Sequence, residues 1–156
     1  MALKFIVLVI VAAITLQMAE AQSGVNAKGI TFDLFGVPVT LYCTPDGNMG
    51  NFGPAAPPFR GAEVQLQCGN SEIIANSTTN SFGITYLVTE AAPVFSFFPP
   101  QFNCKIVVDT KLSSCNATLP FIGFLESPLE FVGTYLQKNL KIANFSPTGF
   151  SYNPGL

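Results

Sequence analysis

The chain has 156 residues and a net charge of −2, contains no histidine, and has charged residues at only 10 % of its positions. Its few lysines and arginines are scattered, which excludes the basic face that a nucleic-acid-binding protein needs. Without histidine the commonest general base is absent, which excludes Ser-His-Asp and Cys-His catalytic centres.

The N-terminus has the features of a cleaved secretion signal. Lys4 gives a basic start, residues 5–16 are apolar, and residues 19–21 (Ala-Glu-Ala) form a small-x-small cleavage site. The alternative is an uncleaved anchor, but about 12 apolar residues are fewer than the ~20 that span a bilayer. We therefore expect residues 1–21 to be removed, and residues 22–156 to form a single secreted domain without a membrane span.

Strands are predicted where apolar and polar residues alternate, at 37–44, 63–68, 73–79, 82–89 and 104–110. Cys43, Cys68 and Cys104 lie on the apolar side of this alternation, so each should face a core. Inward cysteines on different strands can be bridged across that core. With Cys115, the four cysteines predict two disulfides in an oxidising compartment. Three pairings remain open from the spacing, and no metal site is expected.

Two stretches between these strands have no apolar period. Residues 47–61 are rich in Gly, Pro and Asn and are predicted to form a surface loop, and residues 91–103 form another irregular segment. The run 82–89 alternates apolar Phe82, Ile84, Tyr86 and Val88 with Gly83, Thr85, Leu87 and Thr89.

The C-terminal third is predicted to contain one short helix, near 128–138. Ser127 is a candidate N-cap, Pro128 would occupy the first helical position and Glu130 the third. Leu129, Val132, Leu136 and Leu140 would then form an apolar stripe, although Gly133 weakens this interpretation. The last strands are expected at 141–145 and 149–152.

Carboxylates are the remaining candidates for catalysis, as pairs of the glycosidase type. The mature chain offers Asp33, Asp46, Glu63, Glu72, Glu90, Asp109, Glu126 and Glu130. Most fall in turns or on polar strand faces, where solvated surface charge is the expected role. We therefore expect no catalytic residues, no metal and no cofactor.

Three sequons match N-x-[ST], at Asn76, Asn116 and Asn144. Asn116 follows a cysteine directly and is expected in a loop, so we predict that it carries a glycan. Asn76 lies near a strand end. Asn144 has an aromatic middle residue and a proline soon after, which disfavour its use.

Phenylalanines crowd the proline-rich segment, at Phe95, Phe97, Phe98 and Phe102. One interpretation is a loop folded over an open end of the core. The other is an exposed apolar patch that adheres to wax, lipid or a hydrophobic partner.

Five segments together resemble a known plant superfamily. Residues 61–68, GAEVQLQC, resemble the G-A-x-V-x-L-x-C motif of the pollen-allergen and extensin-like proteins, and residues 39–43 match that group's opening V-x-C strand. Residues 103–108 (NCKIVV), 112–119 (LSSCNATL) and 147–150 (PTGF) are closer still to the phylloplanins. Their order and spacing are more specific than any one motif.

The resemblance covers most of residues 37–152 and implies an all-β fold, an antiparallel β-sandwich or barrel with Greek-key-like connections. It also implies that Cys43 pairs with Cys115, and Cys68 with Cys104. The pollen members carry six cysteines, whereas this chain has four. The third bridge of those relatives is therefore absent here.

Two functions follow from the resemblance. Phylloplanins are extracellular proteins of aerial plant surfaces that inhibit fungal-like pathogens, which implies a secreted, non-catalytic defence protein. The alternative is a cell-wall-associated module that binds glycans or wall polymers in development. The implied partners are microbial surfaces, or plant cuticle and wall components.

Overall fold

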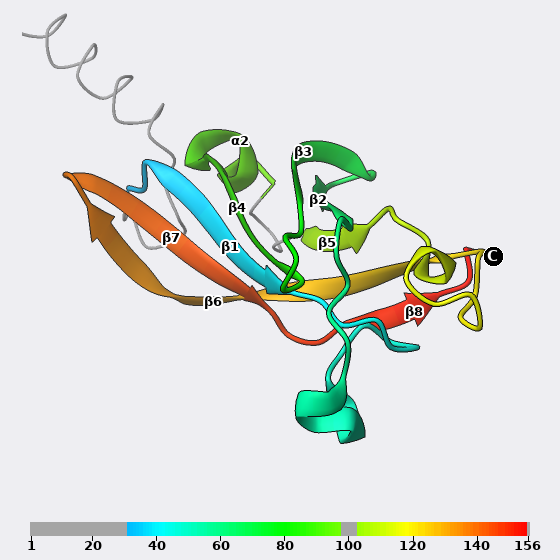
Figure 1. Cartoon of the computed structure of the whole chain (residues 1–156). Coiled ribbons are helices and arrows are strands. Elements are labelled where there is room, and N and C mark those ends of the chain that lie inside the picture. Colours follow the sequence, from blue (N-terminus) through cyan, green and yellow to red (C-terminus); the bar gives the residue numbers. More distant parts are fainter. Residues whose placement is uncertain (1–30, 98–102, 156) are drawn as a thin grey trace, which may run out of the picture.

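The computed structural model describes residues 31–97 and 103–155, which contain eight strands of one strongly curved sheet (Figure 1). The expected secretion signal lies outside the described residues. The strands are β1 (Leu34–Thr40), β2 (Glu63–Cys68), β3 (Glu72–Thr78), β4 (Ile84–Glu90), β5 (Cys104–Val108), β6 (Phe124–Gln137), β7 (Leu140–Pro147) and β8 (Ser151–Asn153). The helical elements are two short 3₁₀ turns, η1 (Gly50–Ala55) and η2 (Leu112–Ser114), and α2 (Ala91–Phe95).

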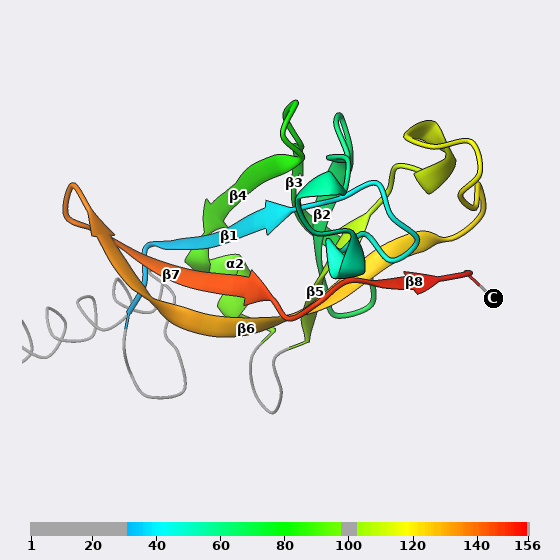
Figure 2. The same ribbon diagram turned by 60° about the horizontal axis from the view of Figure 1, so that its bottom comes forward.

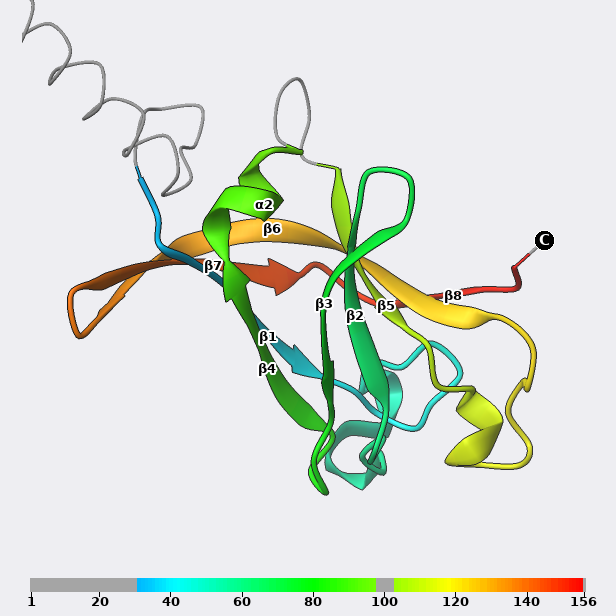
Figure 3. The same cartoon turned by 90° about the horizontal axis from the view of Figure 1, so that it is seen from above.

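The strands follow one another in the order β3-β2-β5-β6-β7-β1-β4, and β8 pairs with β6 (Figure 2). The two ends of this order, β3 and β4, are joined by a turn and then diverge (Figure 3). Near the turn, the hydroxyls of Ser77 and Thr85 are hydrogen-bonded at 2.5 Å. The sheet is therefore a nearly closed barrel, as the all-β prediction required.

Neighbouring strands are often distant in sequence, as in β1 with β4 and β2 with β5, in keeping with the expected Greek-key-like connections. One pairing departs from the antiparallel expectation. Leu34–Gly36 of β1 runs parallel to Ile142–Asn144 of β7. Parallel neighbours require a long crossover, and almost the whole chain lies between these two strands.

In β2 and β5 the core lies where the alternation predicted it. Val64, Leu66 and Cys68 of β2 are buried, as are Ile106 and Val108 of β5. Side chains change face at every residue of a strand, so these residues fill the barrel from one side. The predicted strand boundaries are within a few residues of those observed.

The helix predicted near 128–138 is wrong, because these residues belong to the long strand β6. The first half of β6 pairs with β5 and β8, and the second half, from Leu129 onward, pairs with β7. Val132 is an extra residue in a β-bulge between Phe131 and Gly133. From Leu129 onward, pairing with β7 satisfies backbone groups that a helix would satisfy internally, and β-branched and aromatic residues favour this outcome.

A two-residue turn at Lys138 and Asn139 connects β6 to β7. Both residues have positive φ, at 49° and 69°, and Gln137 pairs directly with Leu140. This is the geometry of a type I′ hairpin, whose twist matches that of the strands. The turn lets β6 and β7 project together beyond the rest of the barrel (Figure 1).

A cluster of phenylalanines fills the barrel beside this hairpin. Phe35 and Phe145 have ring centroids 4.7 Å apart, and Phe32 stacks on Phe95 at 5.6 Å. Phe95 is buried on α2, which the sequence left irregular. Phe97 is half-buried and packs against the core.

Of the two interpretations of the phenylalanine-rich segment, the structure therefore gives Phe95 and Phe97 the covering role over the core. Phe95, being buried, is not part of an exposed patch. Phe98 and Phe102 lie outside the described residues.

The predicted loop at 47–61 contains η1 and is fixed at both ends. Asn48 exchanges two hydrogen bonds with the backbone of Phe150, with its Nδ2 donating at 2.7 Å and its Oδ1 accepting at 3.1 Å. Tyr42 forms a β-bridge with Pro58. The start of the loop is therefore hydrogen-bonded to the C-terminal segment.

Candidate functional site

Two disulfides hold the fold, and both join the cysteines that the resemblance paired. Cys68 and Cys104 occupy directly opposite positions of β2 and β5, so this bridge links neighbouring strands rather than crossing the core. Cys43 and Cys115 join the segment after β1 to the loop after η2. Within the described residues no cysteine is free and no cluster of acidic or thiol groups could hold a metal.

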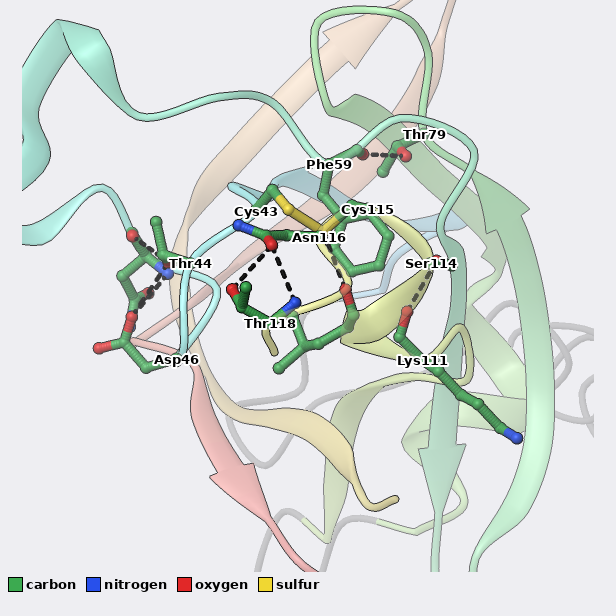
Figure 4. Close-up of a disulfide and its surroundings, with 12 residues drawn as sticks. Cys43, Thr44, Asp46, Phe59, Thr79, Lys111, Ser114, Cys115, Asn116 and Thr118 are labelled. Carbon is green, nitrogen blue, oxygen red and sulfur yellow. Dashed lines mark hydrogen bonds between the residues drawn. A yellow bond between two sulfur atoms is a disulfide. The ribbon is translucent and has the colours of Figure 1, made fainter. Parts of the chain in front are cut away.

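The Cys43–Cys115 bridge anchors a loop between β5 and β6 that we call the 111–123 loop (Figure 4). Leu112 at its start is buried, and Tyr152 Oη donates a hydrogen bond of 2.5 Å to the carbonyl of Ile122 near its end. Asn116 Oδ1 accepts from both the backbone and the hydroxyl of Thr118. The loop is therefore held at its start, middle and end.

A groove of about 600 Å³ lies between the 111–123 loop and the solvent-facing side of β2 and β5. Its lining includes the floor residue Val107, the polar residues Gln67 and Lys105, and the exposed loop residues Phe121 and Ile122. It combines apolar and hydrogen-bonding surfaces in one open depression, which suits an extended ligand better than an enclosed small molecule.

An ion pair borders this groove. Lys105 Nζ lies 2.9 Å from Glu126 Oε2, and Asn153 Nδ2 donates to Glu126 Oε1 at 3.2 Å. The hydrogen bond from Lys105 is the main cause that lowers the pKa of Glu126, and it outweighs the opposing effect of partial burial. Glu126 is therefore held as a carboxylate, the opposite of what a general acid requires.

A second surface is formed by the apolar row of β4, which the structure turns toward solvent. Leu87 faces the core opposite Val37, so Ile84, Tyr86 and Val88 point outward. Tyr135 of β6 is also exposed and close enough to influence the titration of Tyr86. We call Ile84, Tyr86, Val88 and Tyr135 the outer face.

Tyr86 is fixed in place on this outer face. Its hydroxyl donates a hydrogen bond of 2.8 Å to Asn144 Oδ1 on β7, which requires the side chain to cross β1. Gly36 allows the crossing, because a Cβ there would lie 2.2 Å from the Tyr86 oxygen. Partial burial, and then the neighbouring Tyr135, raise the pKa of the Tyr86 phenol above its usual value of 10.0.

The three sequons occupy different settings. Asn116 is exposed in the 111–123 loop, and Asn76 is exposed on β3 opposite Gln65. Asn144 is half-buried on β7 and accepts the hydrogen bond from Tyr86. Asn116 lies in a loop, as expected, and its use as a glycosylation site stays a prediction.

The candidate carboxylates come from different elements of the fold. Asp33 accepts a hydrogen bond from the backbone of Lys141, and Asp46 accepts one from the backbone of Asn48. Glu63, Glu72, Glu90, Asp109 and Glu130 lie along separate strands and loops. In the part of the chain that the structure describes, the carboxylates do not form a cluster of three or more with one another.

Sequence reasoning missed Phe121 and Ile122 of the groove and the outward direction of the apolar row of β4. Phe121 and Ile122 fall in a segment without strand alternation, so only their apolar character next to a proline could have marked them. The outward direction of Tyr86 depends on the register between β4 and β1, which no local pattern reveals.

Comparison with known proteins places the chain in a family. Residues 31–156 match the family model described as "Phylloplanin antifungal protein". The chain is 34 % identical over 116 residues to the phylloplanin of Nicotiana tabacum, covering 72 % of this chain and 73 % of that protein. Among solved structures it is similar to the major plantain pollen allergen Pla l 1, with a TM-score of 0.37 and 18 % identity over 79 % of this chain and 99 % of that one. The long family match and the tobacco relative show that this chain belongs to the phylloplanin family.

Proposed function

We propose that this protein is secreted onto the plant surface and inhibits the growth of fungi or oomycetes there by binding rather than by catalysis. The observation that carries this proposal is the match of residues 31–156 to a family described as antifungal. The sequence features of a secretion signal and the two disulfides support an extracellular location. No helix among the described residues is long and apolar enough to cross a membrane.

The non-catalytic part of the proposal rests on chemistry. The chain has no histidine, and Glu126, the carboxylate beside the groove, has a lowered pKa through its contact with Lys105. A carboxyl that donates a proton near neutral pH needs a raised pKa instead. Binding is the activity that the observed surfaces support.

The outer face is the surface that we assign to contact with an apolar microbial or cuticular surface. The outward residues of β1 opposite it, Gly36, Pro38 and Thr40, are uncharged, and the exposed Glu90 lies at the end of the same row of β4. Apolar side chains have no charge whose hydration must be given up, so burying this exposed row against a partner lowers the free energy.

The experiment is a germination assay with the mature, disulfide-bonded protein. Fungal spores and oomycete zoospores are germinated over a concentration series, with serum albumin as the inert control. Germ-tube extension that falls with concentration supports the proposal. Normal extension at every concentration, in both classes of organism, would refute it.

A cell-wall-associated role in development is the second candidate, and the mixed polar and aromatic groove on β2 and β5 favours it. The tissue in which the native protein accumulates distinguishes the defence role from the developmental role. Immunolabelling of epidermis or trichome surfaces supports defence, whereas labelling of pollen or vascular walls supports the developmental role.

A further inference from the structure

We propose that the groove between the 111–123 loop and the solvent-facing side of β2 and β5 binds a neutral β-linked oligosaccharide chain. This inference goes beyond the proposed function by naming a ligand class and a second site. The groove shares no lining residue with the outer face of Ile84, Tyr86, Val88 and Tyr135, so it can be tested separately from growth inhibition.

The groove is elongated. A second hollow of about 160 Å³ shares Gln67, Ser71 and Lys105 with the main one and extends it to Gly69 and Asn103, beside the Cys68–Cys104 bridge. Asn103, Lys105, Val107 and Asp109 line the two hollows, so together they follow the solvent side of β5. Two adjoining open hollows of this kind fit consecutive units of a polymer better than one compact molecule.

Its lining has the two kinds of surface that a pyranose ring presents. Phe121 has 61 % of its surface exposed and forms one wall with Ile122, so it offers an apolar ring to the C–H face of a sugar. Gln67, Lys105 and Asp109 bring hydrogen-bonding groups to the same groove for the hydroxyl rim. An acyl chain would offer no partner to the remaining hydrogen-bonding capacity of these groups, which disfavours a lipid ligand.

The polar groups are held in position before any ligand binds. Gln67 Nε2 donates to Gln65 Oε1 at 2.9 Å, and Lys105 is fixed by its contact with Glu126. The Lys111 ammonium lies 5.1 Å from the centroid of Phe121 and supports the ring. Side chains that are already ordered lose less entropy on binding, so the site is preorganised.

The charges in and beside the groove balance. Lys105 and Lys111 are matched by Asp109 and Glu126. A polyanion such as a pectic uronate would gain no net attraction here. The groove therefore favours an uncharged chain, and both fungal β-1,3-glucan and plant β-1,4-glucan have this chemistry.

The test is a titration of the ¹⁵N-labelled mature protein, observed by NMR, with three probes. Laminarihexaose and cellohexaose represent the fungal and plant sources, and hexagalacturonate is the anionic control. We expect at least one neutral hexasaccharide to shift the amide signals of residues 105–109 and 121–124. The relative affinity of the two glucans identifies the source.

Two variants and a matched control locate the site. Phe121→Ala should weaken binding of the neutral hexasaccharide about tenfold by removing the stacking ring, and Gln67→Ala about fivefold. Phe82→Ala removes a phenylalanine that is even more exposed than Phe121, at the turn before β4, and should leave the affinity unchanged. Because Phe121 is exposed, its variant should keep the thermal stability of the parent.

The inference is overturned if no neutral hexasaccharide shifts these signals at millimolar concentration, if Phe121→Ala binds as tightly as the parent, or if hexagalacturonate binds more tightly. The germination assay remains a separate measurement. A protein that binds a glucan in the groove but leaves germ tubes unaffected would refute the antifungal proposal and leave the groove assignment standing.

Discussion

Tyr86 and Asn144, which are 58 positions apart, are joined by a hydrogen bond of 2.8 Å across the strand that separates them. The bond is possible because Gly36 leaves the space that the phenol occupies. A tyrosine fixed in this way presents nearly half of its surface to solvent without a flexible side chain. A fixed aromatic ring costs little entropy when it is covered by a partner.

Gly36→Ala should destabilise the protein by about 1–2 kcal/mol, because the new methyl group displaces the Tyr86 hydroxyl from Asn144. Tyr86→Phe, which loses only the hydrogen bond, should cost about 1 kcal/mol. Urea unfolding measures both. A glycine in an extended strand is normally stabilised by replacement with alanine, so a Gly36→Ala protein as stable as the parent would contradict this packing.

The Cys43–Cys115 bridge should stabilise the fold by about 4 kcal/mol in the chain-entropy model, since it closes a loop of 72 residues. The double variant Cys43→Ser/Cys115→Ser should therefore unfold at a markedly lower temperature and lose order in the 111–123 loop. Calorimetry and peptide mapping under non-reducing conditions provide the measurements. A peptide that links Cys43 to Cys68 would show that the pairing is wrong.

Asn116 should carry an N-linked glycan in protein secreted by plant cells, because it is exposed in a loop whose turn already presents its side chain. Enzymatic deglycosylation should lower the mass of the parent, and Asn116→Gln should remove most of that difference. Asn144→Gln serves as the comparison, since Asn144 is half-buried on a paired strand. An unchanged mass after deglycosylation would rule out the glycan.

Acid should remove the contribution of the Lys105–Glu126 pair to the stability of the folded protein. The pKa of Glu126 in the folded state lies below its usual value of 4.5, so the pair stabilises the protein above about pH 4.5 and loses this effect as the pH falls through the lowered folded-state pKa. The difference in urea midpoint between the parent and Glu126→Gln should shrink between pH 6 and pH 3. A difference that stays constant over this range would show that the carboxylate is not coupled to folding.

The strands that the sequence predicted correctly are those with unbroken alternation, such as β2, where Val64, Leu66 and Cys68 all face the core. The failure in β6 has a specific cause. Its bulge at Val132 places Leu129, Phe131, Thr134 and Leu136 on one side, at spacings of two, three and two. The bulge broke the alternation, whereas the spacings of three, four and four among Leu129, Val132, Leu136 and Leu140 matched a helical period, and the Ser-Pro-x-Glu start reinforced that interpretation.

The candidate surfaces were less predictable than the fold. The groove needs Phe121, from an irregular loop, to meet Gln67 and Lys105 from two strands, and only the tertiary arrangement brings them together. The apolar row of β4 was visible in the sequence, but its direction was not. A one-residue change of register against β1 would have buried Tyr86 and exposed Leu87.

The most direct measurement of the central claim is the concentration that halves germ-tube extension, compared between the parent and the variant Ile84→Thr/Val88→Thr. Threonine keeps the β-branched shape that a strand favours while it removes apolar surface from the outer face, and Val132→Thr is the matched control on the bulge of β6. Inhibition through the outer face predicts a weaker effect for the double variant at unchanged thermal stability, with the control equal to the parent. Equal potency of all three proteins would contradict that claim.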